Sequence, residues 1–296
     1  MEFLGTFVQQ LANGVVLGSV YALIAIGLTL IFGVLGLVNL AQGEFFTVGA
    51  YAGLLVLSHG LGVPAALLAG VLAAVAVGLL TEQLALRPLP HGIDPHIPMV
   101  ATIGVSIVLQ QIASKLFTTR ALPYPTPPLL AERVGLGPVR VEYLDLLILA
   151  LVVALMAALT LFLKRSKLGI AIRAVAENGR AASLVGINRR FVILAVFAIS
   201  SALAGIGGVL VGMYFNNVNP YVGFPIALKG LAAVIIGGLG SAVGAVVAGL
   251  MIGIVEVLAV GYVSSSWRDA IAFGVMILIL LVRPAGLFGR PSAEKV

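Results

Sequence analysis

The sequence predicts an all-α, polytopic membrane protein, a helical bundle of about eight to nine transmembrane helices with some broken or re-entrant segments. Its 296 residues are 61% hydrophobic and 9% charged, with a mean hydropathy of +1.18, a composition foreign to soluble globular domains. Apolar runs of about 20 residues, enough to cross a roughly 30 Å hydrocarbon layer as helix, recur along nearly the whole length. The 36 glycines and 14 prolines fit closely packed membrane helices. We expect one membrane domain over residues 1–296.

Charge and residue usage exclude several classes of function. The net charge of +6 is concentrated in one loop and the C-terminal tail, which fits the positive-inside pattern better than nucleic-acid binding. There is no cysteine, and the three histidines are scattered, so we expect no metal site and no cofactor. No nucleophile–base set lies at useful spacing, and no G-x-x-x-x-G-K-[ST] phosphate loop occurs. We therefore expect a protein that is not an enzyme; if ATP drives it, another chain binds the ATP.

The first half of the chain predicts five spans. Residues 1–10 carry no Lys or Arg, so the first apolar run is expected to be a retained span whose N-terminus lies outside. The loop 118–142, rich in proline, is placed outside too, although its three arginines oppose the positive-inside rule. The loop 87–98 is then cytoplasmic. The spans are expected at 7–32, 41–57, 63–86, 99–117 and 143–163.

The second half predicts one long span and three further apolar segments. The segment 226–239 is short and is interrupted by glycines, so it is expected to be half a helix that turns back or meets another half. Arg283, Arg290 and Lys295 mark an inside tail. An outside N-terminus and an inside C-terminus require an odd number of crossings, which nine satisfies. The four segments are 191–214, 226–239, 242–260 and 269–282.

Residues 164–190 form the only long polar island. They hold seven of the 17 Lys and Arg residues and a single acid, Glu177. Helical periodicity predicts a charged face with Arg173, Glu177, Arg180 and Leu184, opposite a small-residue face with Ile172, Val175, Ala176, Gly179, Ala182, Ser183 and Ile187. Gly179 interrupts the helix, and Gly186 followed by Ile187 is typical of a left-handed helix stop. We expect two short helices outside the membrane, on the inner side.

Two breaks in the apolar pattern are candidates for a translocation pathway. At the first, Asn39 and Glu44 could simply cap a helix entrance. We favour instead a broken helix whose N–H groups and side-chain amides face a water-filled path, because polar Gln42 and Glu44 are costly beside lipid. The residues expected to line the pathway are Asn39, Gln42, Glu44, Gly237, Gly238 and Ser241.

The remaining ionisable groups in apolar runs have a simpler interpretation. Glu82, Lys229 and Glu256 do not form the paired carboxylates or His chains of a proton-driven carrier, so interfacial snorkelling or internal pairing is expected. Arg268 and Asp269 are interpreted as a solvated loop pair.

A faint internal repeat relates residues 33–88 to residues 237–284. Each segment begins near a glycine-rich break and ends with Arg-Pro, at Arg87-Pro88 and at Arg283-Pro284. Duplicated halves are common in transporters.

Four stretches together resemble a known family over nearly the full length: NGVVLGSVYALIAIGLTLIFGV, VNLAQGEFFTVGAY, RAVAENGRAASLVGINRR and LLVRPAGLFG. The family is the inner-membrane permease of branched-chain amino acid ABC importers, specifically the shorter, H-type Liv subunit. The resemblance implies a cytoplasmic coupling helix that docks on an ATPase subunit. The chain reads Glu177-Asn178-Gly179 where the general importer motif reads E-A-A, a looser version found in this branch. The coupling role then falls to Ala176, Glu177, Ala181, Ala182 and Gly186.

The resemblance implies a multi-pass inner-membrane permease for branched-chain or similar small amino acids. It implies four partners besides membrane lipid: a homologous second permease, two cytoplasmic ATP-binding subunits and an external solute-binding protein. Selectivity would rest largely on that binding protein, so a urea or short-amide ABC permease is an open alternative. An ion-coupled secondary carrier is another, and it would need a coupling site within the spans. A membrane scaffold without transport activity is a third.

Overall fold

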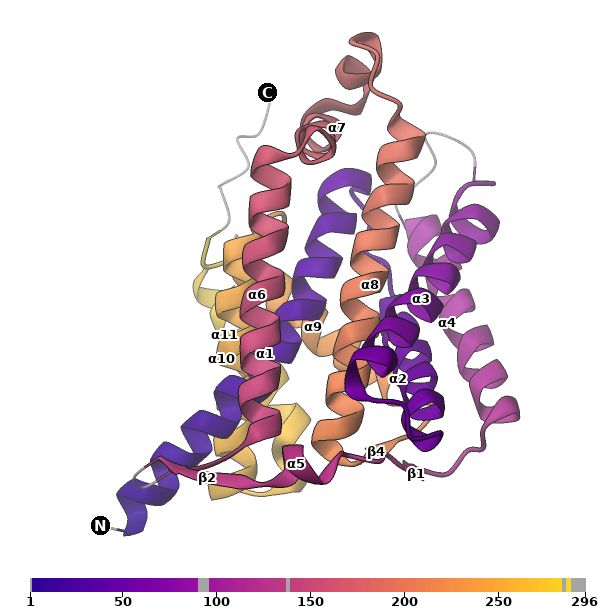
Figure 1. Ribbon diagram of the computed structural model, residues 1–296. Helices are drawn as coiled ribbons and strands as arrows, with labels where there is room; N and C mark the ends of the chain where they lie inside the picture. Colours follow the sequence, from indigo (N-terminus) through magenta and orange to yellow (C-terminus); the bar gives the residue numbers. More distant parts are fainter. Residues whose placement is uncertain (1, 90–95, 137–138, 284–285, 289–296) are drawn as a thin grey trace.

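The computed structural model describes residues 2–89, 96–136, 139–283 and 286–288, which are mostly helical. The predicted all-α polytopic bundle is confirmed (Figure 1). The helices are α1 (Glu2–Leu35), α2 (Gln42–Ser58), α3 (Val63–Thr81), α4 (His96–Leu116), α5 (Pro128–Ala131), α6 (Tyr143–Arg165), α7 (Lys167–Leu184), α8 (Arg189–Phe215), α9 (Gly223–Gly237), α10 (Ala242–Tyr262) and α11 (Arg268–Val282). A π-helical turn, Glu82–Leu86, continues α3, and a 3-10 turn, Ser265–Trp267, precedes α11.

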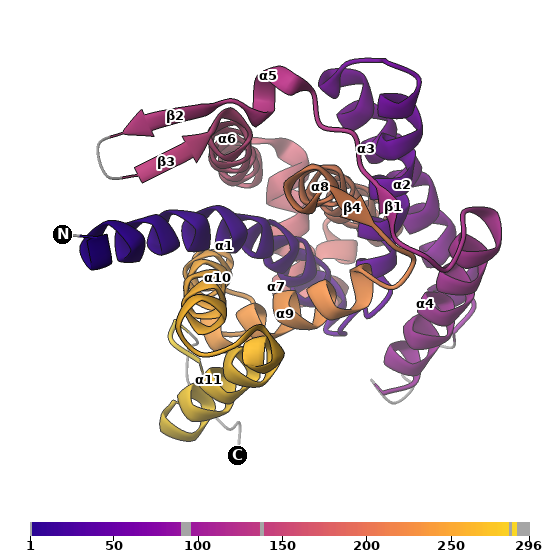
Figure 2. The same cartoon turned by 90° about the horizontal axis from the view of Figure 1, so that it is seen from below.

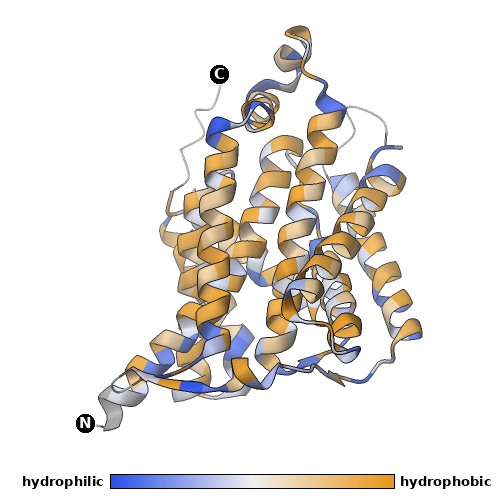
Figure 3. Ribbon diagram, viewed as in Figure 1, coloured by the Kyte–Doolittle hydropathy of each residue, from blue (hydrophilic) through white to orange (hydrophobic). Residues whose placement is uncertain are grey.

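The predicted apolar segments match the observed helices within a few residues. Seven helices in the described part of the chain are long and apolar enough to cross a membrane. The other two predicted segments are the shorter helices α2, with 17 residues, and α9, with 15. Figure 3 shows that hydrophobic residues dominate the helices between the two ends of the bundle. Residues 90–95 of the predicted inner loop and 289–296 of the predicted tail lie outside the described residues.

The two ends of the bundle carry different segments. The N-terminal part of α1 and the segment 118–136 lie at one end, and α7 lies at the other (Figure 1). Two hydrogen bonds join Gln9 of α1 to the backbone of Arg140, at 2.7 and 2.9 Å. The relative placement agrees with the predicted topology.

The segment predicted as a proline-rich loop contains short strands. Strand β2 (Arg133–Leu136) pairs antiparallel with β3 (Val139–Glu142), and β1 (Leu122–Pro123) pairs antiparallel with β4 (Asn217–Val218). The β1–β4 pair ties the segment to the end of α8. The Tyr124 side chain packs inward, and its hydroxyl donates to the Ala50 carbonyl at 3.1 Å.

Helices α1 and α8 form the centre, between α10 and α11 on one side and α2, α3 and α4 on the other (Figure 2). Glycines allow their backbones to approach their neighbours. A Cβ on Gly253 of α10 would lie 2.2 Å from the Gly18 Cα of α1, and a Cβ on Gly205 of α8 would lie 2.5 Å from the Gly70 carbonyl of α3. Without a hydrophobic driving force between helices in lipid, such close contact is a main source of association.

The packing has the pattern of an inverted repeat. Helix α1 rises in Figure 1 and packs on α9 and α10, whereas α8 descends and packs on α2 and α3. The two short helices begin beside one another, since a Cβ on Gly43 would lie 2.4 Å from the Gly223 carbonyl. This pattern relates α1–α3 to α8–α10. The helices that this pattern relates are not the segments 33–88 and 237–284 of the predicted repeat. That repeat stays a prediction.

The glycine contacts generate a prediction. Replacing Gly253 by Val should lower the stability of the chain by about 1–3 kcal/mol or more, because the added side chain overlaps the α1 backbone. The thermal unfolding midpoint in detergent measures this. Gly104→Val is the matched control, since a Cβ on this helical glycine of α4 would meet nothing within 4 Å. Equal midpoints for both variants would contradict the role of the contact.

Candidate functional site

A polar cluster lies inside the bundle where α2 begins. The chain leaves α1 through Gly36, whose φ is +68°, and re-enters the bundle before α2. Asn39, Gln42 and Glu44 are almost completely buried, at 1%, 0% and 1% exposure. The Asn39 Oδ1 accepts from the Ala41 N–H at 3.1 Å, and the Gln42 Nε2 donates to the Ser200 carbonyl of α8 at 3.0 Å. The first predicted break is therefore a polar helix start buried in protein, the setting in which irregular backbone is tolerated at membrane depth.

Glu44 is a buried carboxylate held by neutral groups. Its Oε1 accepts from the Ser106 hydroxyl at 3.0 Å and from the Gln110 Nε2 at 2.8 Å, both on α4. Among the described residues, no Lys, Arg or His forms an ion pair with it. Its place in the first turn of α2 stabilises a negative charge. A cationic group of a small solute would find here a carboxylate with no competing counter-ion.

Further hydrogen-bonding capacity surrounds this helix start. The Asn39 Nδ2, Gln42 Oε1 and Ser200 Oγ atoms are buried and have no partner among the described residues. Gly27 of α1 lines the same place, because a Cβ there would lie 2.9 Å from the Ser200 Oγ and 3.0 Å from the Gln42 Nε2. The turn before α2, the start of α2 and α8 thus present donors and acceptors that suit water or a polar solute.

The second predicted break lies elsewhere. Gly237 and Gly238 end α9, and the Ser241 Oγ caps α10 by accepting from the Gly244 N–H at 3.1 Å. The Leu287 and Phe288 N–H groups bond to the Ile236 and Gly237 carbonyls at 2.7 and 3.1 Å. Because α9 is about 20 Å long at 1.5 Å per residue, these residues are separated from the start of α2. The opposite end of α9, at Gly223, meets Gly43 instead.

An ionic cluster with a buried Lys229–Glu256 pair joins four helices. The Lys229 Nζ of α9 lies 3.0 Å from Glu256 Oε1 of α10 and 2.9 Å from Asp269 Oδ1 of α11. Arg268 also pairs with Glu256, and the Tyr21 hydroxyl of α1 donates to it at 3.0 Å. Of the two interpretations of Lys229 and Glu256, snorkelling and internal pairing, the structure confirms internal pairing. The interpretation of Arg268 and Asp269 as no more than a solvated loop pair is wrong: both are partly exposed, but they begin α11 and pair with Glu256 and Lys229. No pattern in the local sequence signals that contact.

Helix α7 consists of two helical pieces, as predicted. The break falls at Asn178, with φ −156° and ψ 98°, next to the predicted Gly179. The Asn178 Oδ1 accepts from the N–H groups of Arg180 and Ala181 at 3.1 and 3.0 Å and so caps the second piece. Gly186 has φ +86°, as its predicted left-handed stop requires. Ser166 and Asn188 cap α7 and α8, so the helical island joins α6 and α8 through short connections.

Helix α7 has one side that is buried against the bundle and another that is exposed. Ile172, Val175 and Ala182 are each 3% exposed and pack on the bundle. The charged face with Arg173, Glu177 and Arg180 is exposed as predicted, but Ala176 and Ser183, predicted on the opposite face, are exposed too. The kink rotates the second piece relative to the first, which a single helical wheel does not represent. Of the five predicted coupling residues, Ala176, Glu177, Ala181 and Gly186 are exposed and Ala182 is buried.

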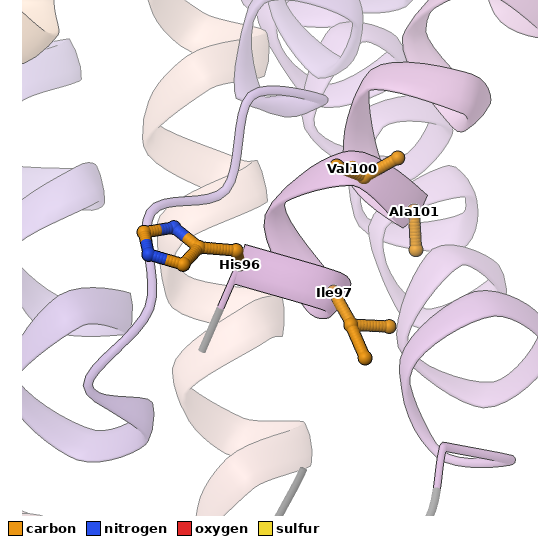
Figure 4. Close-up of a pocket in the computed structure, with 4 residues that line it drawn as sticks. All are labelled: His96, Ile97, Val100 and Ala101. Carbon is orange, nitrogen blue, oxygen red and sulfur yellow. The ribbon is translucent and has the colours of Figure 1, made fainter. Parts of the chain in front are cut away.

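The hollow shown in Figure 4 has a different character. His96, Ile97, Val100 and Ala101 at the start of α4 line a volume of about 490 Å³ that is mostly apolar. It lacks the convergent polar groups that orient a small ligand. The buried start of α2, which does have such polar groups, is the candidate site for solute. The exposed side of α7 is the candidate docking site for another subunit.

Similarity to known proteins extends over nearly the whole chain. A family model described as the permease component of the branched-chain amino acid transport system matches residues 10–280. The chain is 38% identical to the high-affinity branched-chain amino acid transport system permease protein BraD of Pseudomonas aeruginosa, covering 98% of each. It is 37% identical to the permease protein LivH of Escherichia coli K12, again over 98% of each. The solved PsaBC structure from Streptococcus pneumoniae, bound to a Fab, has a TM-score of 0.51 and 13% identity over 94% of this chain and 92% of that one, which shows a shared fold.

The Asn178 cap gives a local prediction. Asn178→Ala should destabilise the second piece of α7 by about 1 kcal/mol, because two N–H groups lose their acceptor. Hydrogen exchange of the Arg180 and Ala181 amides should accelerate about fivefold. Asn178→Asp keeps an acceptor oxygen and should leave exchange close to that of the parent. Equal acceleration in both variants would show that the cap does not hold the kink.

Proposed function

The chain belongs to the permease family of the branched-chain amino acid transport system, and from this premise we propose that it is the permease subunit of an ATP-driven importer for branched-chain or similar small amino acids. It is a multi-pass protein of the inner membrane. The observation that carries the proposal is the match to BraD, which extends over 98% of both chains. These relatives favour an amino-acid importer over a urea or amide permease or an ion-coupled carrier.

As a transport permease, the chain works in a complex with other subunits. The partners in this proposal are a second homologous permease, two cytoplasmic ATP-binding subunits and an external solute-binding protein. The ATP-binding subunits carry out hydrolysis, and this chain hydrolyses nothing. The absence of a phosphate-loop motif from the sequence supports that division of labour.

In this proposal α7 is the coupling helix. Ala176, Glu177, Ala181 and Gly186 contact the ATP-binding subunit, while Ala182, buried on the bundle, anchors the second piece of α7. Leu184 and Val185 add exposed apolar area, at 89% and 77% exposure. A soluble partner that covers such side chains gains hydrophobic free energy, and the charged face supplies specificity.

The contacts supply a route from α7 to the interior. Helix α8 begins four residues after Val185 and runs without a break to Phe215. Its Ser200 carbonyl accepts the hydrogen bond from Gln42 at the start of α2. A displacement of α7 therefore moves the helix that holds the polar cluster, as in rigid-body rocking of transporter halves.

The pathway in this proposal passes the start of α2. The zwitterion of an amino acid carries a carboxylate, which the N–H groups of a helix start favour, and an ammonium group, which Glu44 favours. Asn39 and Gln42 supply further polar contacts. Gly237, Gly238 and Ser241, at the other end of α9, allow that half-helix to shift, since Gly238 has φ +98° in the turn toward α10.

Reconstitution tests the function directly. The chain with its partner subunits in liposomes should accumulate labelled leucine when ATP and the loaded binding protein are present, and should not do so without ATP. Accumulation by the chain alone under a proton or sodium gradient would contradict the importer assignment.

A charge reversal tests the coupling role. Glu177→Arg should weaken association with the ATP-binding subunit about tenfold in quantitative pull-down, a loss of about 1.4 kcal/mol, because it reverses the one acid on the docking face. Glu132→Arg makes the same change on an exposed residue at the opposite end of the bundle and should leave association unchanged. A normal pull-down for Glu177→Arg would refute docking through this face.

Replacement of the buried carboxylate tests the pathway. Glu44→Gln keeps the shape and should reduce leucine uptake about 10- to 150-fold, since a charged hydrogen bond inside protein contributes about 1.5–3 kcal/mol. Assembly with the partner subunits should persist, as gel filtration of the complex would show. Glu82→Gln neutralises another buried acid, at the end of α3, and should leave uptake within about twofold of the parent. Equal losses in both variants would indicate a general effect of removing buried charge.

A further inference from the structure

The ionic cluster of Lys229, Glu256, Arg268 and Asp269 has no role in the pathway just described. Its inner members are buried, with side-chain exposures of 6% for Lys229 and 0% for Glu256. Its outer members, both at the start of α11, are partly exposed, at 34% for Arg268 and 63% for Asp269. Two cations and two anions make the cluster neutral as a whole.

The cluster can divide without leaving a buried charge unpaired. Two crossed ion pairs, Arg268 to Glu256 and Asp269 to Lys229, attach α11 to the α9–α10 hairpin. If the start of α11 moves away, Lys229 and Glu256 remain 3.0 Å apart and Tyr21 still donates to Glu256. Arg268 and Asp269 leave together as adjacent opposite charges that already contact solvent. Breaking a buried pair is costly when one charge stays behind alone, and this arrangement avoids that cost.

Apart from the ion pairs at its start, α11 has few contacts with the bundle along its length. Ala272 is its one buried residue in the described range, and Leu278 and Leu281 are 63% and 77% exposed. Beyond its C-terminal end, the Leu287 and Phe288 N–H groups bond to the α9 backbone. Figure 2 shows α11 at the edge of the bundle, beside α10. The helix is thus fixed by backbone hydrogen bonds near one end and by ion pairs at the other.

Lys229 places the cluster close to the candidate pathway. It lies six residues after Gly223, about 9 Å along α9, and Gly223 is the residue that contacts Gly43 at the start of α2. Attachment of α11 therefore restrains the same half-helix that borders the polar cluster. Release of the start of α11 leaves α9 held by α1, α2 and α10 and by the backbone hydrogen bonds of Leu287 and Phe288.

We propose that these four residues form a latch that closes the start of α11 onto α9 and α10, and that the latch opens in each transport cycle while the Lys229–Glu256 pair persists. The proposal deepens the proposed function and rests on it for its readout. The contrasting possibility is a static staple that stays closed throughout transport.

Cross-linking distinguishes a latch from a staple, because the chain has no cysteine of its own. In the complete transporter, K229C/D269C places one thiol on each side of the latch and leaves Arg268 and Glu256 as a neutral pair. E256C/R268C is the mirror variant and leaves Lys229 with Asp269. Opening leaves Glu256 unpaired in the first variant and Lys229 unpaired in the second, so both reduced variants should take up leucine about tenfold more slowly than the parent. Bridging the thiols with a short bifunctional reagent should lower uptake at least about tenfold, and cleaving the bridge should restore it.

The control is R133C/E142C, which bridges an exposed ion pair between facing residues of β2 and β3 at the same end of the bundle. Its cross-linked form should keep full uptake. Undiminished uptake by cross-linked K229C/D269C, with bridging verified by intact mass, would overturn the latch. Uptake at the parent's rate in both reduced variants would overturn it too, because opening would then leave a buried charge unpaired at no cost. A parent transporter without leucine uptake would instead refute the proposed function.

Discussion

Close backbone contact between helices, made possible by glycine, is the constraint on which the rest of this structure depends. Where α10 meets α1 at Gly253 and Gly18, and α8 meets α3 at Gly205 and Gly70, there is no space for side chains. These contacts surround two helices that begin within the bundle. A helix start exposes N–H groups that lipid cannot satisfy, so α2 and α9 can begin there only because α1 and α8 enclose them.

The enclosed region contains both an unpaired carboxylate and a group of ion pairs. Glu44 is surrounded by hydroxyl and amide donors, so its charge remains uncompensated by any described cation. Lys229 and Glu256 neutralise each other and the two charges at the start of α11. A lone carboxylate suits recognition of a passing cationic group, whereas neutral pairs suit contacts between helices. In the proposed pathway, the group that meets the solute is thus separate from the groups that hold the helices together.

The connection between the inner end and the interior is short in sequence. Helix α7 is capped at Ser166 and Asn178, turns at Gly186, and continues into α8 after the Asn188 cap. Because α8 also supplies the carbonyl that holds Gln42, one rigid helix links the exposed island to the start of α2. The proposed importer needs such a link, because in that proposal separate ATP-binding subunits supply the free energy.

The sequence by itself determined the class of the protein, the bounds of its helices within a few residues, and the kinked polar island. These follow from local properties: the length of apolar runs, the placement of glycines and the clustering of charge. The start of α2 was also predictable, because Asn39, Gln42 and Glu44 interrupt an apolar pattern. Only the tertiary structure decided that Gly223 rather than Gly237 meets the start of α2, and that Arg268 and Asp269 fold onto Lys229 and Glu256. Those contacts join residues far apart in the chain, and their energies depend on helix packing, for which a nearly uniform apolar sequence carries little local signal.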